Sequence, residues 1–140
     1  MSEWLIGKDF EVTTWVARQI KVREIRHVYK AFGVVKDGEL IAGVVLSQYT
    51  GFDVWLSGAA TKRDWLSRRL IVDLADFVFN DLKCVRMTAV CKKQNKHARQ
   101  MLVRLGFREE GTLKKGYDGI NDAVFYGMLG DDSKWLLTRD

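Results

Sequence analysis

A helix enclosed between two strands, in residues 95–107, is the feature that most constrains how this chain can fold. Its apolar residues recur at the spacing i, i+3, i+4 and i+7 that lines one face of a helix: Ala98, Met101, Leu102 and Leu105. Gly106 stands where a left-handed C-terminal cap belongs. Strand-like runs precede the helix at residues 85–91 and follow it at residues 107–114. This order places the helix N-terminus, with Asn95, at the end of a strand, where free backbone N–H groups favour an anionic or amide-rich ligand.

The first half of the chain is predicted to build antiparallel strands after one helical segment. Apolar residues over residues 9–25 favour an amphipathic helix or a broken pair of helices. Residues 31–35 and 40–46 are predicted to form a hairpin, because the Asp37-Gly38 pair between them is a strong turn signal. Residues 52–60 then alternate as a further strand.

The second half changes to a helical period and then returns to strands. Residues 64–82 are predicted to form a long apolar helix that packs on the sheet, with Asp64 as its N-cap. A turn at residues 117–119 leads into a last antiparallel strand at residues 123–129. Together the elements predict an α+β, or mixed α/β, three-layer domain.

One compact domain over residues 1–140 is expected, because a chain of this length with 47% hydrophobic and 29% charged residues can bury an ordinary core. No apolar run approaches a membrane span and the first residues lack a secretory signal, so we expect a cytoplasmic protein with no membrane partner. Cys84 and Cys91 would lie at opposite ends of one strand, roughly 23 Å apart, and so cannot bridge each other. The cysteines and histidines have no ligand-like spacing, which predicts no metal site.

The formal net charge of +5 favours an anionic partner without selecting one. Coenzyme A, an acidic protein surface and nucleic acid would all be attracted, although no nucleic-acid-binding motif is present. The basic residues cluster at Lys62-Arg63, at Arg68-Arg69 and in residues 92–99, which flank the two predicted helix starts. This clustering favours phosphate binding over a merely solvated basic surface.

The segment at residues 95–111 resembles the last signature motif of the GNAT acetyltransferases. In that motif an asparagine, two residues and an alanine match Asn95 and Ala98, a Leu-Gly-Phe triplet matches residues 105–107, and a Glu-Gly pair matches Glu110-Gly111. The chain is most similar to short RimJ/RimL-like members, including small ones carried by tailed phages. Three further tracts carry that likeness: residues 65–68, residues 77–82, and a tail with residues 127–129 and 134–136.

The resemblance implies a GNAT-like three-layer fold. Its central twisted sheet would be mostly antiparallel, with a parallel pair at the cofactor cleft and helices on both faces. The resemblance also implies acetyl-CoA as the cofactor and an amine as the acceptor. A phage-encoded member would act in the host cytoplasm. The oligomeric state stays open.

The same resemblance implies a cofactor site at the end of the strand 52–60 and in the loop that follows it. The small residues from Ser57 onward would let the pantetheine arm approach the backbone as an added strand. The implied cofactor-binding residues are Ala59, Ala60, Lys62, Arg63, Trp65, Leu66, Ser67, Arg68 and Asn95. Trp65 and Ser67 stand where the family has glycines, and Trp65 is equally consistent with a core aromatic residue.

The candidate catalytic residues are Asp53 and Ser57, which lie on the same predicted strand. By its position Asp53 matches the family's general base, although an ordinary surface aspartate is the alternative. The tyrosine that protonates the leaving thiolate in many relatives is replaced by Leu102, and Tyr117 or Tyr126 could substitute for it. The acceptor pocket is expected between residues 11–29 and 47–52, with Trp4, Trp15, Tyr49 and Trp55 as candidate wall residues.

Three classes of function follow. The first is an N-acetyltransferase that moves an acetyl group from acetyl-CoA to a protein N-terminus, a lysine or a small-molecule amine. The second is a catalytically inactive GNAT-fold protein that binds a host protein. The third, which the net charge alone favours, is a basic protein that binds or modifies nucleic acid.

Overall fold

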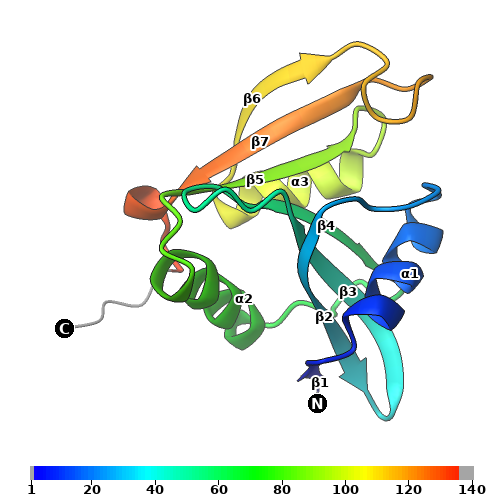
Figure 1. Cartoon of the computed structure of the whole chain (residues 1–140), viewed down its shortest axis with the longest axis vertical. Helices are drawn as coiled ribbons and strands as arrows, with labels where there is room; N and C mark the ends of the chain where they lie inside the picture. Colours follow the sequence, from blue (N-terminus) through cyan, green and yellow to red (C-terminus); the bar gives the residue numbers. More distant parts are fainter. Residues whose placement is uncertain (1, 136–140) are drawn as a thin grey trace.

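The computed structural model describes residues 2–135, which form a seven-stranded sheet with helices on both faces (Figure 1). The strands are β1 (Ser2–Leu5), β2 (Val28–Lys36), β3 (Glu39–Ser47), β4 (Trp55–Ala60), β5 (Arg86–Lys92), β6 (Arg108–Leu113) and β7 (Ala123–Leu129). The helices are α1 (Asp9–Gln19), α2 (Arg68–Ala75) and α3 (Lys96–Leu105), with a π-helical segment at Asp76–Asp81 and a 3-10 turn at Gly130–Asp132.

The sheet order β1-β2-β3-β4-β5-β7-β6 contains one parallel pair, β4 and β5, and every other neighbouring pair is antiparallel. This arrangement confirms the predicted fold class. The strand predicted at residues 123–129 is β7, and the predicted hairpin is β2 and β3. Asp37 and Gly38 both have positive φ, 53° and 78°, as a tight hairpin turn requires. Strand β1, which pairs with the edge of β2, was not predicted, because four residues are too few to show a period.

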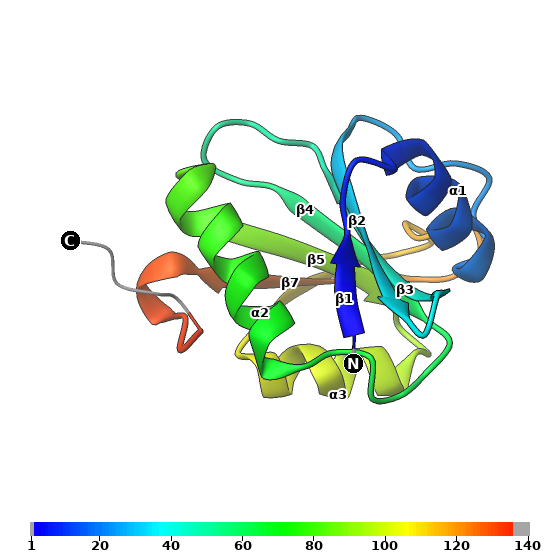
Figure 2. The ribbon, with the colours of Figure 1, turned by 90° about the horizontal axis from the view of Figure 1, so that it is seen from below.

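Helices cover both faces of the sheet (Figure 2), and each face carries a separate core. Helices α2 and α3 cover one face over a large apolar cluster that includes Leu70, Val78 and Leu102. Helix α1 covers the other face, where Val12 and Val16 pack on β2 and β3. Gly43 of β3 permits the close approach of α1, because a Cβ there would overlap Val16.

The helix predicted at residues 64–82 begins later than predicted. Ser67, not Asp64, is the N-cap: its hydroxyl accepts a hydrogen bond from the Leu70 N–H at 3.2 Å. Asp64 instead lies 4.0 Å from Lys36 on the surface. The physical reason is Trp65, which is only 8% exposed and belongs to the large core, so the chain stays irregular until that indole is buried. The predicted single helix also changes to a π-helix from Asp76.

Other predicted bounds differ less. Helix α1 ends at Gln19, so residues 20–25 are not helical, and the strand predicted from residue 52 begins at Trp55. Helix α3 agrees with the prediction: Asn95 accepts a hydrogen bond from the Ala98 N–H at 3.1 Å, and Gly106 caps the helix with φ of 103°.

Cys84 and Cys91 are both buried and do not bridge each other, but Cys84 lies just before β5, whereas the sequence placed both cysteines on one strand. In the predicted tail, Trp135 donates its indole N–H to the Leu105 carbonyl at 2.8 Å, and Leu136 lies outside the described residues. Within residues 2–135 no helix has both the length and the apolar character needed to cross a membrane. The same part of the chain contains no cluster of three or more potential metal ligands.

Candidate functional site

The parallel strands β4 and β5 pair at one end and separate at the other. Two residue pairs join them, Trp55 with Thr88 and Leu56 with Ala89. Beyond these pairs, residues 57–60 of β4 have no partner on β5, although their other edge stays paired with β3. A free strand edge presents unpaired backbone N–H and C=O groups, so this stretch can accept an extended ligand as an added strand.

A cavity of about 930 Å³ opens at this separation. It runs along residues 55–66 of β4 and the following loop, and α2 and α3 contribute apolar side chains such as Leu74 and Met101. The end of α1 and the connection from α1 to β2 border it through residues 19–22 and 24–26. Its volume lies at the upper end of the roughly 300–1,000 Å³ range of small-molecule sites.

Most of the predicted site residues line this cavity. They are Ser57, Ala59, Ala60, Lys62, Arg63, Trp65, Leu66 and Asn95. Three predicted residues do not line it: Asp53, Ser67 and Arg68. The structure therefore brings the end of β4, its loop and the start of α3 together around one cavity, and Ile71 is the residue of the first turn of α2 that lines it.

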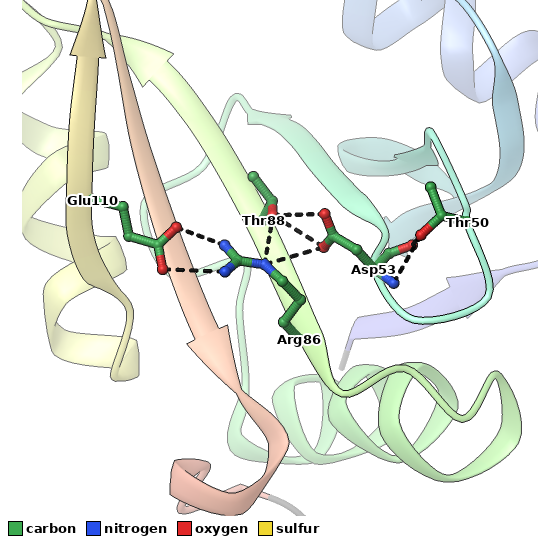
Figure 3. Close-up of polar contacts among 5 residues, drawn as sticks. All are labelled: Thr50, Asp53, Arg86, Thr88 and Glu110. Atoms are coloured by element: carbon green, nitrogen blue, oxygen red, sulfur yellow. Dashed lines mark hydrogen bonds and ion pairs between the residues drawn. The ribbon is translucent and has the colours of Figure 1, made fainter.

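Asp53 belongs to an ionic network instead (Figure 3). Its carboxylate accepts the Thr88 hydroxyl at 3.0 Å and lies 3.5 Å from Nε of Arg86. The Arg86 guanidinium also donates to Glu110 at 2.6 Å, and these hydrogen bonds are the main reason why the pKa of Arg86 is raised. The backbone N–H of Asp53 donates to Thr50. A carboxylate held in this way is poorly placed to take a proton from a substrate in the cavity.

The position of the network explains its role. It spans the paired end of β4 and β5, because Arg86 and Thr88 belong to β5 and Asp53 lies two residues before the start of β4. Glu110 reaches Arg86 across Gly127 of β7, where a Cβ would overlap both side chains. The network thus ties β4, β5 and β6 together at the closed end of the cleft.

Ser67 and Arg68 likewise have other partners. The Ser67 hydroxyl caps α2, and the Arg68 guanidinium lies 5.4 Å from the ring centroid of Trp135. The absence of glycines from this loop does not strain it, because no residue in 61–67 has a positive φ. Glycine would be needed there only for a left-handed backbone or a very close approach of a ligand.

The two candidate tyrosines differ in their access to the cavity. Tyr126 is buried, and its hydroxyl accepts a hydrogen bond from Arg99 at 2.9 Å outside the cavity. Tyr117, in the turn between β6 and β7, lines the cavity, and burial raises the pKa of its phenol. Leu102 also lines the cavity, so the replacement of the family tyrosine leaves an apolar wall there.

Part of the region predicted to bind the acceptor borders the cavity. Within the range 11–29, residues 19–22 and 24–26 border the cavity, and Ser47, Gln48 and Trp55 do so as well. Trp4, Trp15 and Tyr49 do not. Lys92, which belongs to the basic cluster predicted to favour phosphate binding, borders the cavity. Sequence reasoning missed Trp135 as a cavity residue, because a single aromatic side chain is more often part of the core.

Comparison with known proteins supports the fold assignment. No family model matches the sequence, and no curated protein matches it. Solved structures do match, and they place the chain in the GNAT acetyltransferase fold. A ribosomal-protein-S5-alanine acetyltransferase from Vibrio fischeri superposes with a TM-score of 0.72 at 17% identity, covering 95% of this chain and 95% of that chain.

Two further structures show the same likeness. Mutant forms of the spermidine/spermine N-acetyltransferase SpeG from Vibrio cholerae give a TM-score of 0.71 at 14% identity, covering 94% of this chain and 96% of that one. A probable acetyltransferase gives 0.62 at 21% identity over 74% of this chain, which spans only 62% of that protein's length. At these identities the likeness establishes the fold and leaves the chemistry to the site.

Proposed function

We propose that this chain transfers an acetyl group from acetyl-CoA to an amine. The observation that supports the proposal most is the free edge of β4 at residues 57–60, which lies along a cavity with basic residues at its end. A strand edge, small side chains and nearby cations suit a ligand with an extended amide-rich arm and a phosphate-bearing end.

The residues present fit coenzyme A. The backbone of Ser57, Ala59 and Ala60 would hold the pantetheine arm, and Lys62 and Arg63 would hold the phosphates through charge-assisted hydrogen bonds. Asn95 and the first turn of α3 add backbone donors on the other side of the cavity. Bound acetyl-CoA would supply the acetyl group as a thioester, whose C–S bond breaks as the amine nitrogen forms an amide.

The chain contributes mainly positioning and proton transfer. Backbone N–H groups near Ala59 would polarise the carbonyl that is attacked. Tyr117 would donate a proton to the departing thiolate, because its phenol borders the cavity and a tyrosine is protonated at neutral pH. The Ser57 side chain lines the same cavity and would orient the reacting groups. Asp53 would act indirectly, through the ionic network with Arg86 and Glu110 that holds β4, β5 and β6 together at the closed end of the cleft.

A thermal-shift titration with CoA and acetyl-CoA tests the proposal. At 100 times the dissociation constant a ligand stabilises the folded state by about 2.7 kcal/mol, which corresponds to a rise in Tm of roughly 8 °C for a chain of this size. The variant Arg63→Glu should weaken binding roughly tenfold, because it reverses one phosphate-facing charge. Arg108→Glu is the matched control, since Arg108 is exposed on β6 away from the cavity.

An unchanged Tm at saturating CoA would contradict the proposal and favour the inactive, protein-binding alternative.

We also propose that residues 1–140 act as a single domain of the RimJ/RimL-like, phage-type class in a cytoplasmic setting. The match to the ribosomal-protein-S5-alanine acetyltransferase structure, which covers 95% of each chain, supports the single-domain part of this proposal. Release of the CoA thiol, monitored with a panel of amines, would identify the acceptor.

A further inference from the structure

The charged side chains that border the cavity are almost all basic. Five lysines and arginines line it: Lys21, Arg26, Lys62, Arg63 and Lys92. The single carboxylate on the wall within residues 2–135 is that of Glu24, and it lies 3.0 Å from the Arg26 guanidinium, which neutralises it. The network carboxylates of Asp53 and Glu110 do not border the cavity and are paired with Arg86.

These cations come from three different segments around the cavity. Lys62 and Arg63 belong to the loop after β4, where the proposed function places the phosphates of CoA. Lys21 and Arg26 belong to the connection between α1 and β2, and Lys92 ends β5. The phosphates of CoA account for Lys62 and Arg63, and Arg26 is paired with Glu24. Lys21 and Lys92 therefore remain for the acceptor.

The wall near Lys92 is aromatic. In the parallel register Trp55 lies opposite Thr88, so Trp55, Val90 and Lys92 share one face of the sheet, and Phe125 lies opposite Val90 on β7. The rings of Trp55 and Phe125 meet edge to face with centroids 5.4 Å apart, and both are half-buried. The Lys92 ammonium lies 5.5 Å from the ring centroid of Tyr117.

An aromatic wall with a basic rim selects among amines. A polyamine would bring several ammonium groups towards Lys21 and Lys92, and no unpaired carboxylate of the described residues borders the cavity to receive them. An amine whose molecule also carries a ring and a carboxylate would contact the aromatic wall and pair with the rim.

We propose, on the basis of the proposed acetyl transfer, that the acceptor is an amine that carries an aromatic or bulky apolar group and a carboxylate. Either an aromatic amino acid or the N-terminus of an acidic peptide has this chemistry. The polyamine specificity stated for the SpeG neighbour does not extend to this chain.

The experiment uses acceptors that differ only in charge. The C-terminal amides Phe-Glu-NH2, Phe-Gln-NH2 and Phe-Lys-NH2, free phenylalanine and spermidine are titrated calorimetrically into the full chain, with and without CoA. The dissociation constants should rank Glu below Gln below Lys, about threefold to tenfold per unit of charge, since rim charges are partly screened. Spermidine should bind more weakly than Phe-Gln-NH2. Binding of free phenylalanine as tight as that of the Glu dipeptide would identify an amino acid as the acceptor, and weaker binding would identify a peptide.

Charge reversal at one position sharpens the test. Lys92→Glu should reverse the ranking, so that Phe-Lys-NH2 binds more tightly than Phe-Glu-NH2. Lys93→Glu makes the same change in net charge one residue further on, outside the cavity, and should keep the original ranking. Lys21→Gln should reduce the preference for the Glu dipeptide without reversing it, which keeps the test valid if the Lys92 variant folds poorly.

The outcomes separate this inference from the proposed function. A flat ranking, a preference for Phe-Lys-NH2 or spermidine, or equal effects of the two charge reversals would overturn the inference even if CoA binds and transfer occurs. Conversely, a chain that binds the Glu dipeptide as expected but shows no Tm response to CoA would keep the acceptor site and remove the acetyl-transfer proposal.

Discussion

The Asp53–Arg86–Glu110 network yields the sharpest prediction, because it assigns Asp53 a structural role where the sequence suggested a base. The side chain of Asp53 is 15% exposed, that of Arg86 26% and that of Glu110 42%. Arg86→Met would leave the mostly buried Asp53 carboxylate with the Thr88 hydroxyl but no cation, at a cost of about 2–3 kcal/mol. Asp53→Asn keeps the shape and loses the charge, at about 1–2 kcal/mol. Glu110→Gln, at the exposed end, should cost less than about 1 kcal/mol.

Urea denaturation of the three single variants and the D53N/R86M double variant measures these differences. The double-mutant cycle should give a coupling free energy of about 1 kcal/mol between Asp53 and Arg86, because they are direct partners. In thermal melts the R86M loss corresponds to roughly 6–10 °C in Tm. The matched control is E110Q, which removes a charge from the same network at its solvent-facing end.

Two results would refute this reasoning. One is a free energy of unfolding for R86M no lower than that for E110Q, which would mean that the buried carboxylate does not need its cation. The other is a D53N variant that keeps its stability but loses about a hundredfold or more in kcat, as expected for removal of a general base.

Three further predictions concern other parts of the fold. Gly43→Ala should lower the free energy of unfolding by about 1–3 kcal/mol, because the added Cβ would overlap Val16. Gly111 has open space around it, so Gly111→Ala should change the free energy of unfolding by less than about 0.5 kcal/mol. Equal losses for the two variants in chemical denaturation would contradict the packing argument. Ser67→Ala should lower the free energy of unfolding by about 1 kcal/mol through loss of the N-cap, and Asp64→Ala should leave it almost unchanged. The opposite order would show that Asp64 is the N-cap, as the sequence suggested. The hydrogen bond from the backbone N–H of Asn121 is the main reason why the pKa of Asp118 is lowered to about 2. The contribution of the ionised Asp118 carboxylate to stability is therefore fully present above about pH 4 and is lost as the pH falls through 2. An NMR titration of this carboxyl with a midpoint near 4 would show that the turn is not formed.

Local patterns in the sequence predicted the elements that depend on local chemistry. The Asp37-Gly38 turn, the Asn95 cap and the Gly106 cap each depend on residues within a few positions of one another, so their geometry could be inferred without the rest of the chain. The start of α2 could not, because it depends on the burial of Trp65 against a core assembled from distant strands. Asp64 was as good a cap as Ser67 by residue type alone.

The candidate site divides in the same way. The sequence by itself predicted the order of the strands and helices apart from β1, and its resemblance to the GNAT acetyltransferases implied that the end of β4 and its basic loop would form a cofactor cleft with Asn95. Only the tertiary structure decided which polar groups face that cleft: Asp53 turns to Arg86 and Glu110, partners far away in the chain, while Lys92 and Tyr117 border the cavity. The physical reason is that periodicity and capping are short-range effects, whereas the partner of a charged side chain is fixed by strand register and by what its neighbours leave unpaired.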